Sequence, residues 1–162
     1  MSIGHQLLSL WQRVSHLPGG KLLFSYLLGR QVPYTGTVRP IIVELRPGHC
    51  RAEMSDRRIV RNHLNSIHAV ALVNLAEVVG GLAMLTGLPP TLRGIVTGLS
   101  IDYKKKARGR LTAEATVQLP AIDGDIDLPV QSVIMDASGD VVAAMTVRWR
   151  LGPVRERVPV PA

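Results

Sequence analysis

The spacing of apolar side chains predicts a helical beginning followed by a β-hairpin. Within the first 30 residues, apolar side chains recur at the spacing of one helix face, and a Pro-Gly-Gly break divides this region in two. The segment 33–36 is typical of a turn, because proline and glycine both favour turns. Residues 41–45 are rich in β-branched side chains, and residues 50–54 can pair with them across the turn Pro47-Gly48.

After residue 90 the pattern changes to that of β-strands. In residues 111–119 apolar and polar side chains alternate, which predicts a strand with one buried face. A turn is expected at 136–140 from its content of Asp, Ser and Gly. The other strands of this half are predicted at 94–103, 126–135 and 141–150.

The longest apolar segment, residues 69–88, admits three interpretations. A transmembrane helix needs about 20 residues, but Glu77 lies near the middle, where a charge costs about 2.5 kcal/mol or more. An amphipathic surface helix needs a polar face, and this segment has almost none. A helix enclosed by protein on most sides fits best, and Gly87 with Pro89-Pro90 provides a stop signal.

These elements predict an α+β fold in a single domain, residues 1–162. A long helix without a polar face must be covered, and a strongly curved antiparallel sheet can wrap around it. We therefore expect such a sheet around one long central helix, preceded by the helical segment 1–30. Residues 152–162 contain three prolines and are expected to form a loose tail. The pattern leaves the order of the strands open.

The composition restricts the classes of partner. The net charge of +7 and the isoelectric point of about 10.3 favour anionic partners. Nucleic acid is disfavoured, because aromatic residues make up only 4% and no known nucleic-acid-binding motif is present. A phosphorylated small molecule explains the charge equally well. The single Cys50 excludes an intramolecular disulfide and suits the cytoplasm, and the first apolar residues lack the basic segment of a signal peptide.

Glu77 and the start of the long helix suggest a chemistry. A carboxylate in an apolar helix either forms a buried ion pair or serves a function, as general base or nucleophile. The first amides of a helix lack internal acceptors, so the amide of Ala69 can polarise an acyl carbonyl and stabilise an oxyanion. Ser66 or Asn65 could cap this helix, which is the purely structural interpretation of both residues.

The spacing of these two groups predicts a dimer. Glu77 lies eight residues after Ala69, which corresponds to a rise of about 12 Å along one helix. One helix therefore cannot bring both groups to the same carbonyl, whereas two antiparallel helices related by a two-fold axis can. If both groups are catalytic, the protein forms at least a dimer with two equivalent sites.

The segment around these residues resembles the hotdog-fold thioesterases of the phenylacetyl-CoA and hydroxybenzoyl-CoA type. Their signature is Asn-x-x-Gly-x-x-His-Gly-Gly, followed after four residues by Leu-Ala-Asp or Leu-Ala-Glu. Segments 101–109 and 136–143 are also similar, so the resemblance covers about residues 60–149, and the helical beginning resembles an uncharacterised bacterial branch of the superfamily. The signature positions in this chain are Asn62, Asn65, His68, Ala69, Val70, Leu75, Ala76 and Glu77.

The resemblance implies a hotdog fold and an acyl-CoA thioester hydrolase without a cofactor of its own, CoA being part of the substrate. Glu77 would be the nucleophile or general base, and Ala69 would supply the oxyanion-hole amide. Asn62 would orient the water or the thioester, and His68 would order the loop at the helix start. His68 also has two interpretations on its own, a catalytic residue or a hydrogen-bonded structural histidine, and Asn62 could be only a loop-ordering side chain.

Two departures from the signature leave a second function open. Asn65 replaces the first glycine, and Ala69-Val70 replace the Gly-Gly pair, which adds bulk beside the thioester. Asn65 and Val70 are therefore candidates for contact with the substrate. The alternative to an enzyme is a non-catalytic hotdog module that binds acyl-CoA or lipid.

The phosphates of CoA would need a basic site mouth, although a basic run is equally typical of a solvated turn. We expect no metal site, because His63 and His68 have no further ligands nearby in the sequence. The expected partners are an acyl-CoA substrate and a second copy of the chain, forming a dimer or a tetramer, without nucleic acid or a membrane span. The candidate basic residues are Lys104, Lys105, Lys106 and Arg108.

Overall fold

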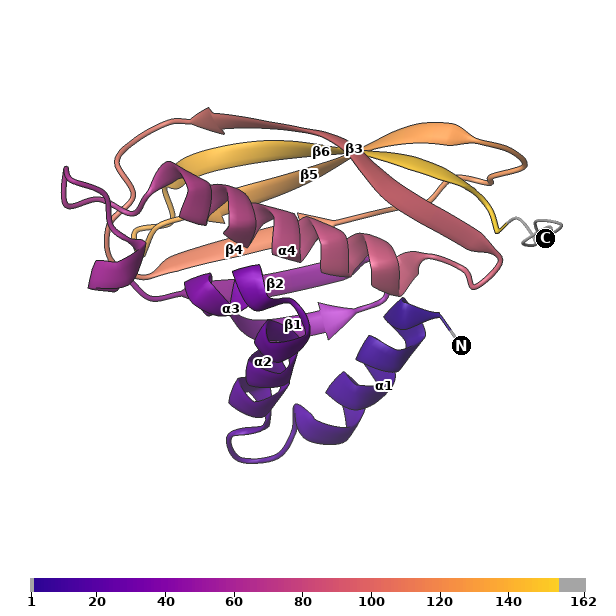
Figure 1. Cartoon of the computed structure of the whole chain (residues 1–162), viewed down its shortest axis with the longest axis horizontal. Helices are drawn as coiled ribbons and strands as arrows, with labels where there is room; N and C mark the ends of the chain where they lie inside the picture. The colour runs from indigo at the N-terminus through magenta and orange to yellow at the C-terminus, as the bar shows by residue number, and fades with distance from the viewer. Residues whose placement is uncertain (1, 155–162) are drawn as a thin grey trace, which may run out of the picture.

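Three helices precede the sheet in the computed structural model, which describes residues 2–154 (Figure 1). α1 (Ile3–Val14) and α2 (Gly20–Gln31) confirm the two predicted helical segments. The predicted turn at 33–36 is wrong, because these residues begin a third helix, α3 (Pro33–Val38). Pro33 lies in its first turn, where the ring sets φ in advance and the missing N–H removes no helix bond.

The six strands of the sheet are β1 (Ile41–Arg46), β2 (His49–Met54), β3 (Leu92–Tyr103), β4 (Leu111–Thr116), β5 (Ile126–Met135) and β6 (Val141–Pro153). They form one antiparallel sheet in the order β1-β2-β4-β5-β6-β3. The predicted hairpins are confirmed as β1 with β2 and β5 with β6. β3 lies at the far edge beyond β6, so the basic segment after it leads back across the sheet to β4.

Most strand ends lie within two residues of the prediction, and the ends of β4 and β6 differ by three residues. β4 ends at Thr116 rather than at residue 119, although the Val117 amide still donates a backbone hydrogen bond to the Gly48 carbonyl at 2.7 Å. β6 continues to Pro153 because it stays paired with the start of β3, so residues 152 and 153 of the predicted tail belong to the sheet. Residues 155–162 of that tail lie outside the described residues.

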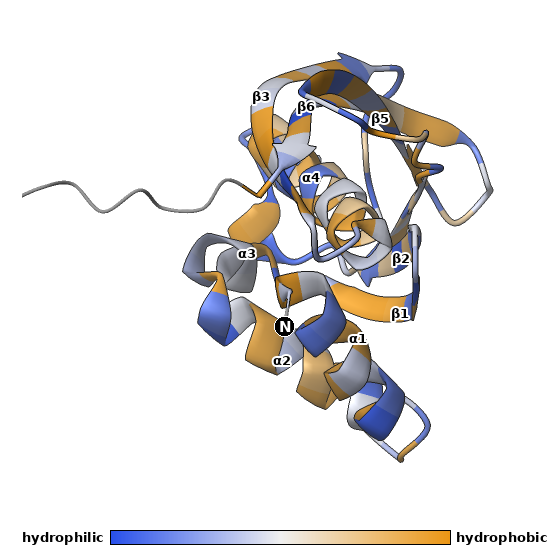
Figure 2. Cartoon of the chain, turned by 90° about the vertical axis from the view of Figure 1, so that its right-hand side faces the viewer, coloured by the Kyte–Doolittle hydropathy of each residue, from blue (hydrophilic) through white to orange (hydrophobic). Residues whose placement is uncertain are grey.

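The long helix α4 (Ala69–Gly87) lies inside the curve of the sheet, as predicted (Figure 2). Its side chains pack against β2, β4, β5 and β6, and Leu75, Val79 and Ala83 are fully buried. α4 is long and apolar enough to cross a membrane, but 72% of its most apolar 18-residue window is buried inside the fold. The burial confirms the interpretation as an enclosed core helix.

The N-terminal helices cover β1 and one side of α4 (Figure 2). Trp11 of α1 contacts Phe24 of α2 edge to face, with ring centroids 5.1 Å apart. Gly4 lies so close to the backbone of Leu85 that no side chain would fit there. The N-terminal helices therefore share one hydrophobic core with α4 and the sheet.

Candidate functional site

His68 organises the start of α4. It occupies the N-cap position, with φ −66° and ψ 140°, and its Nδ1 atom accepts a hydrogen bond from the Val70 amide at 3.1 Å. The expectation that Ser66 or Asn65 caps the helix is wrong, because Ser66 is buried and its hydroxyl donates to the Ile67 carbonyl. Nδ1 is an acceptor here, so the neutral ring carries its proton on Nε2. His68 thus orders the helix start, as one of its two interpretations expected.

Asn62 and Asn65 shape the loop before this helix. The Asn62 Oδ1 atom accepts from the amides of Leu64 at 2.9 Å and Ser66 at 3.2 Å, which is a loop-ordering role. Asn65 has φ +52°, in the left-handed region of backbone conformation. Glycine adopts this region without strain, and asparagine is among the residues that tolerate it best. Asparagine is therefore a residue type that suits this backbone conformation.

The Ala69 amide is the first of α4. Ala69 is exposed, and its N–H has no acceptor among residues 2–154. The Tyr103 hydroxyl, at the end of β3, donates to the Ala69 carbonyl at 3.3 Å and so ties the sheet edge to the helix start. An amide at this position adds to the partial positive charge of the helix N-terminus, and it is accessible to a ligand oxygen.

Glu77 lies two turns further along α4. Between residues 71 and 84 only Val73 and Glu77 are not fully buried, and with Val70 they form one stripe along the helix. Burial raises the pKa of Glu77 above its ordinary value of 4.5. No residue in the range 2–154 donates a hydrogen bond or pairs with its carboxylate. Gly81 leaves room beside it, since a Cβ there would stand 3.5 Å from Glu77 Oε1.

Apolar side chains surround this stripe on the open side of the fold. Leu99 and Tyr103 of β3 are half exposed, as is Val70. Leu99 pairs across the sheet with the fully buried Val147, so both side chains point to the face that carries α4. The other edge of β3 has no strand partner among the described residues. This surface, defined as Val70, Val73, Leu99 and Tyr103, is called the open face below.

The predicted basic residues lie near the helix start, because the Ile67 amide donates to the Ala107 carbonyl at 2.9 Å. Two of them are paired with acids. Lys105 Nζ lies 2.7 Å from both Asp136 Oδ2 and Asp140 Oδ2, and Lys104 Nζ lies 3.8 Å from Asp102 Oδ2. Neither Lys106 nor Arg108 forms a salt bridge among residues 2–154, although the charge of Arg108 helps to lower the pKa of Asp56. The structure therefore leaves these two as the available cations of the group.

Two cavities involve residues that the sequence analysis did not select. A cavity of about 360 Å³ adjoins the start of α4, between His68 and Val70 on one side and Tyr34 and Thr37 of α3 on the other. A larger one, of about 1000 Å³, lies between α2, α3 and β1. One sequence signal points to the larger cavity: no acidic residue occurs before Glu44. No group of three metal-binding side chains occurs among residues 2–154.

Comparisons with known proteins agree with this architecture. The family model described as "Domain of unknown function (DUF4442)" matches residues 20–151. The crystal structure of the protein called genomics APC5556 has a TM-score of 0.81 and 29% identity, covering 94% of this chain and 100% of its own. PA5026 from Pseudomonas aeruginosa, named "Probable Thioesterase", has a TM-score of 0.74 and 24% identity, covering 85% and 97%.

A third structure shares the same fold. A point mutant of the phenylacetic acid degradation protein PaaI from Thermus thermophilus has a TM-score of 0.62 and 20% identity, covering 73% of this chain and 97% of its own. No curated protein sequence matches the chain. The sheet, the enclosed helix and these structures together establish the hotdog fold.

Proposed function

The chain belongs to the family described as a domain of unknown function (DUF4442), and we propose that it hydrolyses acyl-CoA thioesters in a site shared by two subunits. The observation that carries the proposal is the pair of unused groups on α4: the free Ala69 amide and the unpartnered, partly buried Glu77. The neighbours named as thioesterases support the class of reaction.

The proposed reaction needs a base and an oxyanion site. Glu77 takes a proton from water while the water oxygen attacks the thioester carbon, and the carbonyl electrons move to the oxygen. The Ala69 amide of the other subunit donates to that oxyanion. The carbonyl re-forms, the carbon–sulfur bond breaks, and the proton held by Glu77 passes to the departing thiolate. The products are a carboxylic acid and CoA thiol.

The proposed dimer joins the open faces of two subunits. The free edge of β3 would pair with its symmetry mate, and the two α4 helices would run antiparallel, as the rise of about 12 Å between the two groups requires. Burying Val70, Leu99 and Tyr103 supplies the apolar contact for this association. Two such dimers can associate further into a tetramer.

The other candidate site residues position the reacting groups or contact the substrate. His68 and Asn62 hold the helix start so that the Ala69 amide faces the substrate. Asn65 and Val70 border the acyl group, and Val70 narrows the space beside the thioester. The phosphates of CoA contact the basic segment after β3, above all its unpaired cations Lys106 and Arg108. We place this activity in the cytoplasm.

The test is a panel of acyl-CoA esters of different chain length, with release of free thiol as the readout. We expect turnover by the wild type and a loss of about a thousandfold in kcat for Glu77→Gln, since a base contributes about 10²–10⁴-fold. Glu53→Gln is a matched control, because Glu53 lies on β2 and its Oε2 pairs with Arg110 at 3.4 Å. Equal rates for wild type and Glu77→Gln would reject the role of Glu77.

The alternative is a non-catalytic module that binds acyl-CoA. The bulk of the half-exposed Val70, next to the Ala69 amide, favours it. In that case acyl-CoA would bind without turnover, and the affinity would be the same for wild type and Glu77→Gln. Calorimetry with a thioester from the panel and with its non-hydrolysable thioether analogue separates the two functions.

A further inference from the structure

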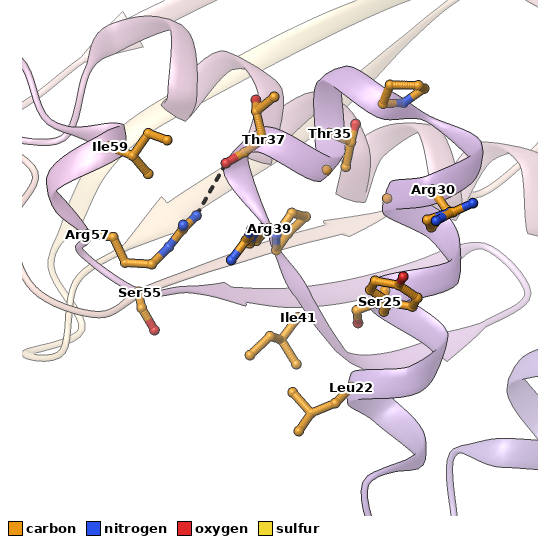
Figure 3. Close-up of a pocket in the computed structure, with 15 residues that line it drawn as sticks. Leu22, Ser25, Arg30, Thr35, Thr37, Arg39, Ile41, Ser55, Arg57 and Ile59 are labelled. Carbon is orange, nitrogen blue, oxygen red and sulfur yellow. Dashed lines mark hydrogen bonds between the residues drawn. The ribbon is translucent and has the colours of Figure 1, made fainter.

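The cavity of about 1000 Å³ lies beside α2 and α3, and Glu77 is not among the residues that line it (Figure 3). Its lining includes Leu22 and Arg30 of α2 and Ile41, the first residue of β1. The segment after β2 contributes Arg57 and Ile59. This volume is at the upper end of the range for small-molecule sites. The cavity is therefore large enough for a ligand of its own.

Positive charge in this cavity has no acidic counterpart. Figure 3 shows Arg39 and Arg57 side by side near its centre, and no Asp or Glu lines it. Arg57 donates to the backbone carbonyls of Val38 at 2.6 Å and Thr37 at 3.4 Å, so its guanidinium is fixed in position. The backbone N–H of Arg39 donates to the Thr35 carbonyl at 3.0 Å, but its side chain has no hydrogen-bond or ion-pair partner among residues 2–154. Burial and the neighbouring Arg39 lower the pKa of Arg57.

The backbone at Arg39 supports a role for its side chain. Arg39 is the C-cap of α3 and has φ +55° and ψ +57°, the left-handed region that favours glycine. An arginine here is strained, and its guanidinium is exposed beside another cation. Neither the strained backbone nor the position beside a second cation stabilises the fold. A negatively charged ligand therefore accounts better for an arginine at this position.

The walls of the cavity are apolar where they face solvent. Leu22, Tyr26 and Ile59 line it and are 58%, 62% and 76% exposed. Large apolar side chains with this exposure lose water contact when a hydrocarbon chain lies against them. The cavity thus combines a fixed pair of cations with an apolar wall.

We propose that this cavity binds a single-chain anionic amphiphile, with its head group on Arg39 and Arg57 and its hydrocarbon chain along Leu22, Tyr26 and Ile59. The head group is a carboxylate or a phosphate monoester, both of which match the planar donors of arginine. An isolated inorganic anion would leave the apolar wall unused, and a neutral lipid would leave the two cations uncompensated. The inference is independent of the proposed thioesterase activity.

The site adjoins the start of α4 without being part of it. Thr37 and Ile59 line both this cavity and the smaller one that reaches His68 and Val70. A bound chain in the larger cavity would therefore lie one layer of side chains from the helix start. Binding is tested separately from turnover, so that a failure of one proposal leaves the other standing.

The test is isothermal titration of the full chain with dodecanoate, dodecyl phosphate, dodecanol and inorganic phosphate. We expect one of the two anionic amphiphiles to bind at least about tenfold more tightly than dodecanol and than inorganic phosphate, because a charge-assisted hydrogen bond is worth about this factor or more. The tighter of the two identifies the head group. Added salt should weaken this binding.

Two pairs of variants locate the binding. Arg39→Gly should weaken it at least about tenfold while the melting temperature stays equal or rises, because glycine suits the left-handed backbone. Arg58→Gln, the exposed neighbour of Arg57 outside the cavity lining, is its control. Leu22→Gln should also weaken binding, whereas Leu23→Gln, 48% exposed and not in the lining, should leave it unchanged.

Several outcomes would overturn the proposal. They are unchanged affinity in Arg39→Gly, equal binding of dodecanol and dodecanoate, and inorganic phosphate binding as tightly as dodecyl phosphate. Binding only to vesicles of anionic phospholipid, with none to the monomeric amphiphiles, would identify a membrane surface as the partner and reject a small-molecule site.

Discussion

The enclosed face of α4 and its open stripe carry different kinds of side chain, for different physical reasons. The enclosed face, with Leu75, Val79 and Ala83, packs against the sheet, and its side chains are accounted for by burial. The open stripe of Val70, Val73 and Glu77 has no partner within the described part of the chain that accounts for an acid among apolar groups. The enclosed face is thus explained by folding, whereas the open stripe is accounted for by the proposed site. Substitutions on the two faces should change different quantities.

The largest effect besides that of Glu77→Gln is expected at the Ala69 amide, the first of α4. Ala69→Pro removes the N–H, yet proline is favoured at the first helical position, and His68 already has the extended backbone that precedes a proline. We expect kcat to fall about 10²–10³-fold with little change in melting temperature. Ala69→Gly keeps the N–H and should retain activity. A large loss of folding stability in Ala69→Pro would contradict this geometry.

Mixing inactive subunits tests whether the site is shared. A dimer of one Ala69→Pro and one Glu77→Ala subunit contains one site with both groups intact, if each site uses two chains. Random exchange of subunits should therefore restore about a quarter of the wild-type activity. If one chain supplies both groups, every mixture stays inactive.

The next-largest effect is expected on the dimerisation of the protein through the open face. Leu99→Glu places a charge in the proposed interface and should shift the protein from dimer to monomer, with loss of activity, because a buried unpaired charge is costly. Leu23→Glu on α2 is the matched control, since both leucines are 48% exposed. Light scattering after size exclusion measures the mass. A Leu99→Glu dimer with full activity would argue against this interface.

The sequence predicted the extent of α4 better than the residue that caps it. An apolar run between strand patterns defines the core helix almost to the residue. The N-cap was missed because Ser66 and Asn65 are of types that cap more often than His68. α3 was missed because a short helix depends on tertiary contacts, such as the Asn74 amide donating to the Thr35 hydroxyl at 3.3 Å.

The larger cavity was missed for a different reason. Arg39 and Arg57 lie 18 positions apart, on either side of the first hairpin, so only the paired strands bring them together. Within the sequence, the lack of any acid before Glu44 is the one trace of this positive region. Local patterns thus predict elements, whereas a site built across elements needs their arrangement.

A smaller effect is expected from pH. The raised pKa of Glu77 means that the folded protein holds this proton at pH values where the unfolded chain has lost it. Stability from this group is therefore present below pH 4.5 and decreases as pH rises toward the folded pKa. Glu77→Gln should raise the melting temperature at pH 8 and leave it unchanged at pH 4. The rate of the wild type should increase with pH through a pKa above 4.5, because the base must be ionised.

The smallest effects are expected from alanine substitutions at two adjacent glycines of α4. Gly80 faces the sheet, and Gly81 lies beside Glu77. A Cβ at Gly80 would stand 2.9 Å from the Ser132 hydroxyl in the sheet, whereas one at Gly81 would meet only Glu77 Oε1, at 3.5 Å. Gly81→Ala should gain up to about 1 kcal/mol of stability from helix propensity. In Gly80→Ala the crowding costs about 1–3 kcal/mol, so the net change should be zero or destabilising. Only Gly81→Ala should alter the pH dependence of the rate, since its methyl group displaces water from the Glu77 carboxylate and raises its pKa further. Denaturant titration at one protein concentration measures the stability of both variants. A pH–rate profile would show the two faces as separate if it shifts in Gly81→Ala and stays at its wild-type position in Gly80→Ala.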